Sequence, residues 1–324
     1  MATVTLAKAL NEGLRAAMER DPKVLVMGED VGKLGGVFRV TDGLQKDFGE
    51  QRVLDTPLAE SGIIGTAVGL AIRGFRPVCE IQFDGFVFPG YDQIVSQLAK
   101  LHFRSQGRVP VPVVVRIPFG GGIGAVEHHS ESPEALFAHV PGLKVVACSN
   151  AVDAYWMIQQ AIASDDPVIF FEPKRRYWEK AELDLDATPP PLHSAQVVRP
   201  GSTLTLVGYG PVLKTCLEAA TASAEDGNDL EVIDLRTLSP LDLEPVVASV
   251  RRTGRLVVVA EAPSETSVAS EVAARVQEEC FLSLEAPVLR VTGFDTPYPP
   301  SKCEDDYIPD LDRVLDAVDR SLAY

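Results

Sequence analysis

The sequence has few cysteines, a deficit of basic residues and no long hydrophobic run. Its five cysteines are scattered without a C-x-x-C pair, which argues against a disulfide framework or a zinc site and indicates a reducing compartment. No apolar run approaches the length of a membrane span, and the first residues show neither a signal peptide nor a transit peptide. We therefore expect a cytoplasmic protein, or a mature mitochondrial matrix protein if the source is eukaryotic. With 30 Lys and Arg against 46 Asp and Glu, the net charge of −16 argues against a nucleic-acid partner.

Several common enzyme signatures are also missing. The glycine-rich segment 120–124 lacks the G-x-G-x-x-G spacing and leads into Glu127 and two histidines rather than an apolar helix, which disfavours a nicotinamide site. The sequence contains no Walker A motif and no G-x-S-x-G motif. These absences argue against P-loop nucleotide hydrolysis and against the serine chemistry of α/β-hydrolases.

Short apolar runs alternate with helical segments along most of the 324 residues. This alternation predicts an α/β protein with two doubly wound domains. An acidic and proline-rich segment, 181–200, is expected to link a first domain over 1–180 to a second domain over 201–324. The expected helices include residues 4–20, 90–102, 151–163, 211–224, 242–252, 266–279 and 310–322.

The segment 55–65 combines a strand end, a proline turn and a helix start. Glu60 is expected at the beginning of that helix, where a carboxylate either serves the helix dipole alone or points into an apolar cleft and exchanges a proton with a bound heterocycle. Gly62, Gly65 and Gly69 then fall on one helical face. Because each glycine inside a helix costs up to about 1 kcal/mol against alanine, we expect close backbone approach of another element at this face.

Two loops carry further candidates. Phe86 is expected between a strand and a helix, where an aromatic ring either packs in the core or stacks on a planar ligand. His128 and His129 follow the glycine-rich segment. They either belong to a polar loop before a helix that starts near Ser132, or place one imidazole at a strand end for proton transfer.

Taken together, several segments resemble one protein family. The segments are 28–31, 35–39, 56–65, 80–83, 91–94, 129–130, 171–174 and 231–237. The family they resemble is the β subunit of the thiamine-diphosphate-dependent 2-oxoacid dehydrogenases, the decarboxylating component of multienzyme complexes. Segments 277–287 and 293–299 look most like the branched-chain 2-oxoacid type.

The resemblance implies a pyrimidine-binding domain followed by a transketolase C-terminal-like domain. It also implies an α2β2 heterotetramer in which thiamine diphosphate is shared with the α subunit. The family's Gly-Asp-Gly…Asn signature for diphosphate and magnesium is missing here, so the α subunit is expected to hold Mg2+. The second domain is expected to bind the dihydrolipoyl acyltransferase core, with an acidic tail over 304–319 as a surface for a basic partner.

The resemblance also implies roles for individual residues. Glu60 is expected to hydrogen-bond the aminopyrimidine ring nitrogen, Phe86 to stack on the pyrimidine and Leu58 to line its pocket. Glu29 is expected to support Glu60. His129, or its neighbour His128, is expected near the thiazolium for substrate or lipoyl chemistry.

Some family members hold a potassium ion with carbonyl groups near a strand that corresponds to residues 111–113 and at a turn that corresponds to residues 161–166. The expected ligands in this chain are Ala161, Ile162, Ser164 and Asp166.

The expected function is therefore oxidative decarboxylation of branched 2-oxoacids, with acyl transfer to lipoyl groups, by a β subunit that is active only with its α subunit. Three alternatives remain open. The first is a pyruvate or acetoin dehydrogenase β subunit, and the second is a non-catalytic assembly subunit. The third is a self-sufficient transketolase-like enzyme, which the missing magnesium signature disfavours.

Overall fold

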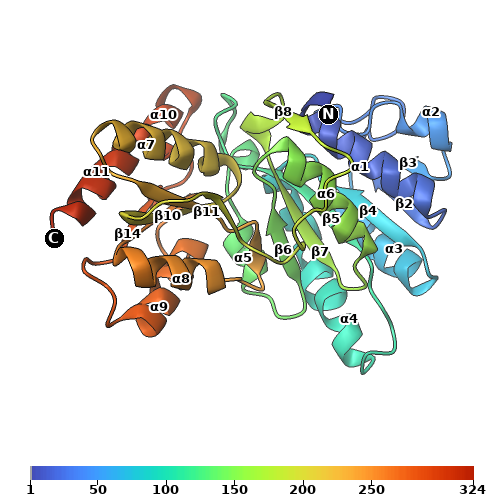
Figure 1. The fold of residues 1–324 in the computed structure, drawn as a ribbon. Helices are drawn as coiled ribbons and strands as arrows, with labels where there is room; N and C mark the ends of the chain where they lie inside the picture. The colour runs from blue at the N-terminus through green and yellow to red at the C-terminus, as the bar shows by residue number, and fades with distance from the viewer. Residues whose placement is uncertain (1) are drawn as a thin grey trace.

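The computed structural model describes residues 2–324, and Met1, the first residue of the expected first domain, lies outside them. Two open sheets lie side by side, each with helices on both faces (Figure 1). The alternation of strands and helices predicted from the sequence is therefore confirmed. None of the helices in the described range is long and apolar enough to cross a bilayer.

The first sheet has seven strands in the order β12-β6-β7-β5-β4-β2-β3. All neighbouring pairs run parallel except β12 and β6. The strands are buried almost throughout, as expected for parallel strands covered on both faces. Their bounds are β2 Val24–Gly28, β3 Val53–Asp55, β4 Arg76–Glu80, β5 Val114–Phe119, β6 Lys144–Ala147, β7 Val168–Pro173 and β12 Thr237–Ser239.

Helices cover the two faces of this sheet through separate apolar clusters. On one face, Val24 and Val26 pack with α1 and α6. On the other face, Met27 and Cys79 pack with α3, α4 and α5. The helix bounds are α1 Leu6–Arg20, α2 Leu44–Phe48, α3 Glu60–Ile72, α4 Ala99–Arg104, α5 Glu134–Ala138 and α6 Ala151–Ala163.

Two helix predictions need correction. The helix expected over 4–20 begins at Leu6, because residues 2–5 form strand β1 (Ala2–Thr5) and Thr5 caps the helix by accepting from the Lys8 amide. The segment expected as a regular helix over 90–102 starts with a 3-10 turn, Asp84–Gly90, and contains a π-helical stretch, Gln93–Leu98, before α4. The helix expected to start near Ser132 begins at Glu134, with Pro133 at the N-cap position.

The second sheet has five strands in the order β14-β13-β10-β11-β9. Helices α7 and α11 cover one face, and α8 and α9 cover the other (Figure 1). The long helices expected here are confirmed within a few residues, and strands alternate with them as predicted. Their bounds are β9 Gln196–Arg199, β10 Leu204–Gly208, β11 Leu230–Asp234, β13 Leu256–Pro263, β14 Leu289–Gly293, α7 Leu213–Glu225, α8 Glu244–Thr253, α9 Val268–Cys280, α10 Glu304–Tyr307 and α11 Leu311–Leu322.

The segment expected as a linker, 181–200, is largely built into the fold. Strand β8 (Lys180–Leu183) pairs with β1, and β9 joins the second sheet antiparallel to β11. The buried guanidinium of Arg236 donates to the carbonyl groups of Pro191 and Ser194 and also pairs with Asp153 at 3.0 Å. The connection is therefore fixed against both units.

The glycine-rich segment 120–124 joins the two units. A Cβ on Gly121 would lie 1.8 Å from the Tyr298 hydroxyl oxygen, so only glycine permits this approach. The Glu304 carboxylate accepts from the amides of Gly122 and Gly124 and from the Tyr298 hydroxyl. Glu304 is thus buried and does not contribute to the expected acidic surface, because its charge is used between the units.

Candidate active site

The ends of three neighbouring parallel strands bring the candidate residues together. Gly28 at the end of β2 lies opposite both Asp55 of β3 and Glu80 of β4. The loops that follow these strands therefore all start at the carboxyl ends of the parallel strands. Glu29 follows β2, Glu60 opens the helix after β3, and Phe86 lies in the turn after β4.

Glu60 is the first residue of α3 and is only 7% exposed. The preceding residue, Ala59, provides no side-chain cap, so the first amides of α3 have no acceptor from the N-cap side chain. Gly90 packs against the Glu60 backbone, where an added Cβ would lie 3.2 Å from the Glu60 carbonyl oxygen. The pKa of Glu29 is raised by burial and by the negative charges of Glu60 and Asp30. Glu29 and Glu60 are therefore close enough to interact electrostatically.

The two histidines differ in their surroundings. The His129 ring is half-buried, with its centroid 4.3 Å from that of Phe83 and 5.1 Å from that of Phe86. Its Nδ1 atom is buried without a hydrogen-bond partner within the described chain. Burial lowers the pKa of His129, and the charges of His128 and Lys174 lower it further. His129 is therefore a neutral imidazole at neutral pH, able to accept a proton.

His128 is exposed, and its Nδ1 atom lies 3.7 Å from a Glu127 carboxylate oxygen. Its ring centroid is 6.1 Å from that of Phe86. A Cβ on Gly85 would lie 2.4 Å from the His128 carbonyl oxygen, so glycine is required where this loop crosses the Phe86 turn. The backbone of His128 thus shapes the site, while the imidazole beside Phe86 and Phe83 belongs to His129.

A buried ion pair holds the loop that carries His129. Lys174, just after β7, donates to both the Asp84 carboxylate and the His129 carbonyl oxygen, and both charged side chains are fully buried. The second Asp84 oxygen accepts from the Glu131 amide at 2.7 Å. The loop is therefore fixed on both sides of Ser130.

A second buried charge cluster lies at the ends of the central strands. Arg116 of β5 forms a two-point contact with Glu172, at 2.6 and 2.8 Å, and contacts Glu80 at 2.6 Å. The sequence interpretation gave no role to Arg116, Lys174 or Asp84. A signal was present for Arg116, which is an isolated charge in an otherwise apolar strand, but not for Lys174, which Arg175 and Arg176 follow directly.

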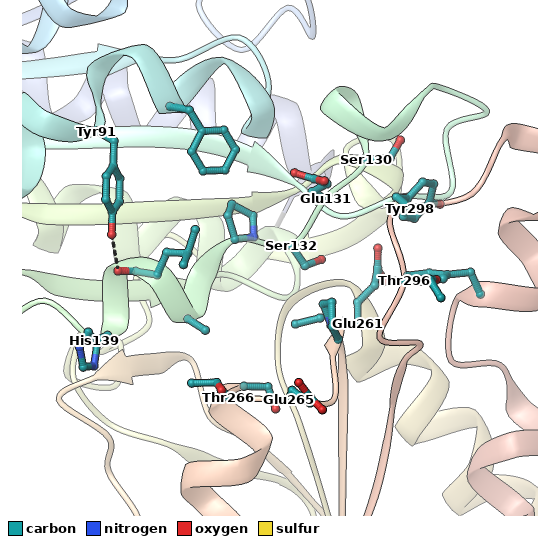
Figure 2. Close-up of a pocket in the computed structure, with 18 residues that line it drawn as sticks. Tyr91, Ser130, Glu131, Ser132, His139, Glu261, Glu265, Thr266, Thr296 and Tyr298 are labelled. Atoms are coloured by element: carbon teal, nitrogen blue, oxygen red, sulfur yellow. Dashed lines mark hydrogen bonds between the residues drawn. The ribbon is translucent and has the colours of Figure 1, made fainter.

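A cleft of about 430 Å³ opens between the two units beside the loop that carries His129. Figure 2 shows Glu131 and Ser132 of the first unit on one side, with Glu261 and Tyr298 of the second unit across from them. Neither Glu60 nor Phe86 lines this cleft. The cluster around Glu60 and the cleft are therefore separate features that border one loop.

Comparison with known proteins places these features in a family. Residues 2–179 match the transketolase pyrimidine binding domain, and residues 193–314 match the transketolase C-terminal domain. The chain is 63% identical, over 99% of its length and 96% of the relative's, to a protein of Leifsonia xyli subsp. xyli named pyruvate dehydrogenase E1 component subunit beta. It is 54% identical, over 99% and 92%, to a Mycobacterium tuberculosis protein named 3-methyl-2-oxobutanoate dehydrogenase subunit beta. The chain belongs to the family of 2-oxoacid dehydrogenase β subunits.

A solved structure agrees on the fold of this β subunit. A protein described as a split gene transketolase, inactive beta4 tetramer, superposes with a TM-score of 0.82 over 99% of this chain and 98% of its own. Its sequence identity of 22% supports the fold alone. The two-domain, transketolase-like α/β fold expected from the sequence is confirmed, and the family depends on thiamine diphosphate.

The residues of the 2-oxoacid dehydrogenase β subunit fit one half of a cofactor site. Glu60 and Phe86 offer a carboxylate and an aromatic face, and the His129 ring, whose Nδ1 atom has no partner among the described residues, lies beside Phe86. Leu58, in contrast, is 76% exposed. Leu58 therefore lies at the surface of the chain, two residues before the buried Glu60.

The residues expected to bind metal lie elsewhere. Ala161, Ile162, Ser164 and Asp166 lie at and after the end of α6, before β7 begins, which is the opposite edge of the sheet from Glu60. Within residues 2–324, no group of three or more His, Cys, Asp or Glu side chains could hold a metal ion.

Proposed function

We propose that this chain is the β subunit of a branched-chain 2-oxoacid dehydrogenase, which decarboxylates branched 2-oxoacids and passes the acyl group to lipoyl groups of a dihydrolipoyl acyltransferase. The observation that carries the reaction type is the convergence of Glu29, Glu60 and Phe86 from three strand ends, with the neutral His129 ring against Phe86. The bound thiamine diphosphate supplies the electron sink for decarboxylation.

The chain's own residues orient the cofactor and move protons. Glu60 holds or releases a proton at the aminopyrimidine ring nitrogen, and the negative charge of Glu29 beside it raises the energy of the doubly ionised pair. Phe86 provides a ring face for the pyrimidine, and Leu58 covers its edge. His129 moves a proton during substrate or lipoyl chemistry, since one sulfur of the lipoyl disulfide must gain a proton when the other takes up the acyl group.

The proposed assembly is an α2β2 heterotetramer whose α subunit holds Mg2+ and the diphosphate. The glycine face of α3 supports this proposal, since no heavy atom of residues 2–324, apart from the neighbouring residues and backbone of α3 itself, lies within 4 Å of a Cβ built on Gly69. Gly65 has only the Gln93 side chain, at 3.7 Å. The close backbone approach expected at this face is therefore not made within the chain and is left for a partner.

The reaction is tested by Glu60→Gln in the chain assembled with its α subunit. We expect turnover to fall by about 10²-fold or more, because a positioned acid or base contributes that much, while assembly and cofactor binding persist. Glu50→Gln, at an exposed glutamate, is the matched control. Unchanged turnover in Glu60→Gln would favour the non-catalytic assembly subunit instead.

Pyruvate is the second candidate substrate, and the 63% identity to the Leifsonia protein named pyruvate dehydrogenase E1 component subunit beta favours it. The branched-chain proposal rests on segments 277–287 and 293–299 and on the Mycobacterium relative's name. Decarboxylation rates for 2-oxoisovalerate and pyruvate, measured with the α subunit and the acyltransferase present, separate the two. A strong preference for pyruvate would overturn the branched-chain assignment.

A further inference from the structure

The carbonyl groups at the C-terminal end of α6 are occupied by an arginine. The Nη1 atom of Arg76, the first residue of β4, donates to the carbonyl oxygens of Ile162 and Ser164, each at 3.0 Å. The last carbonyl groups of a helix lack partners within the helix and carry its partial negative charge. One guanidinium nitrogen therefore satisfies two oxygens where a cation is favoured.

The remaining oxygens expected to bind potassium also have protein donors. The Ala161 carbonyl accepts from the Ser164 amide at 3.2 Å, and the Asp166 carbonyl accepts from the Ser164 hydroxyl at 3.2 Å. The Asp166 carboxylate lies 3.9 Å from the Lys144 amine. A potassium ion at this turn would have to share the Ile162 and Ser164 carbonyl oxygens with the positively charged guanidinium of Arg76, which repels it.

The charges around Arg76 match a cation held in place. Its Nη2 atom lies 2.8 Å from the Asp165 carboxylate, and its Nε atom lies 3.6 Å from the Asp21 carboxylate. The Arg76 side chain is 25% exposed, so most of it is removed from water. A guanidinium stays charged at all relevant pH values and offers five donors in a planar fork. It can therefore contact carbonyl oxygens and carboxylates at once.

We propose that the Arg76 guanidinium takes the place of a monovalent metal ion at the end of α6, so that this turn does not bind potassium. The built-in cation connects the end of α6, the start of β4 and the loop after α1. The proposal does not depend on the substrate or on catalysis, because it concerns the opposite edge of the sheet from Glu60.

Thallium(I), which replaces potassium and scatters anomalously, gives a direct test. Crystals of the assembled protein soaked in thallium(I) should show no anomalous peak at the carbonyl oxygens of Ile162 and Ser164. Crystals of Arg76→Ala should show a peak there, because the freed oxygens and the Asp165 carboxylate remain. A peak in the wild-type protein at these oxygens would overturn the proposal, whatever ion the α subunit binds.

Thermal unfolding gives a second test that does not require crystals of the variant. The melting temperature of Arg76→Ala should fall relative to wild type and be partly restored by low millimolar ethylguanidinium. Arg73→Ala, at an exposed arginine nearby, should keep the wild-type melting temperature. Arg76→Lys should remain less stable than wild type, since an ammonium lacks the fork. An Arg76→Ala protein as stable as Arg73→Ala would overturn the proposal.

Discussion

Replacement of Lys174 by methionine tests the buried ion pair behind the His129 loop. Lys174 and Asp84 are both fully buried, so removing the amine leaves the Asp84 carboxylate in a medium of low polarity with the Glu131 amide as its remaining donor. Loss of one partner of a buried pair destabilises a protein by about 3–5 kcal/mol. We expect a loss of this size in the free energy of unfolding, measured with urea at pH 8.

The pH dependence of the loss follows from the direction of the Asp84 pKa. Burial raises this pKa above its ordinary value, while the contact with Lys174 lowers it. Without Lys174 the pKa rises further, so the folded variant binds a proton that the unfolded chain has already lost. The contribution of protonated Asp84 to the stability of the variant is then retained at low pH and lost as the pH rises through the pKa of Asp84 in the folded state. The deficit of Lys174→Met against wild type should therefore be smaller at pH 6 than at pH 8.

Two controls make the result decisive. Lys214→Met removes a lysine that is 50% exposed and pairs with Glu179, and it should lose less than about 1 kcal/mol. The double variant Asp84→Asn/Lys174→Met should lose less than the sum of the single losses, with a coupling of about 0.5–3 kcal/mol. A Lys174→Met protein as stable as the Lys214→Met control, or additive losses, would refute the reasoning.

Three further outcomes are expected. Burial raises the pKa of Glu134 from 4.5 to about 7, so between these pH values the folded state binds more protons than the unfolded chain. The free energy of unfolding should therefore fall by about 3 kcal/mol as the pH rises from 4.5 to 7. Glu134→Gln should abolish this pH dependence in urea unfolding, and a retained dependence contradicts the assignment. Phe86→Leu should weaken thiamine diphosphate binding to the assembled complex about tenfold, measured by calorimetry. Phe88→Leu, in the same turn, is the control, and equal affinities of the two variants for the cofactor would exclude stacking on Phe86. Gly65→Leu should leave the chain folded but prevent assembly with the α subunit in size-exclusion chromatography; normal assembly would remove the role proposed for the glycine face.

The pattern of strands and helices followed from local sequence because it depends on short-range periodicity. Helix α6 and the strands β10, β11, β13 and β14 lie where their apolar runs place them. The position of Glu60 at the start of α3 was also predictable, since Pro57 forces a turn after a short strand. What failed were the segments whose structure depends on a distant partner, such as β1 with β8 and β9 with β11.

The sequence by itself determined the fold class, the family and the residues that meet at one edge of the first sheet. Only the tertiary structure separated His129 from His128, because adjacent residues in a sequence carry no information about which ring packs on Phe83 and Phe86. It also showed the Lys174–Asp84 pair, whose members are 90 residues apart, and moved Glu304 from the surface to the domain junction. At the end of α6 it placed Arg76 on the carbonyl groups that sequence similarity associated with potassium. For the Lys174–Asp84 pair and for Glu304, the deciding factor is the cost of burying a charged group without a partner, which depends on the whole fold.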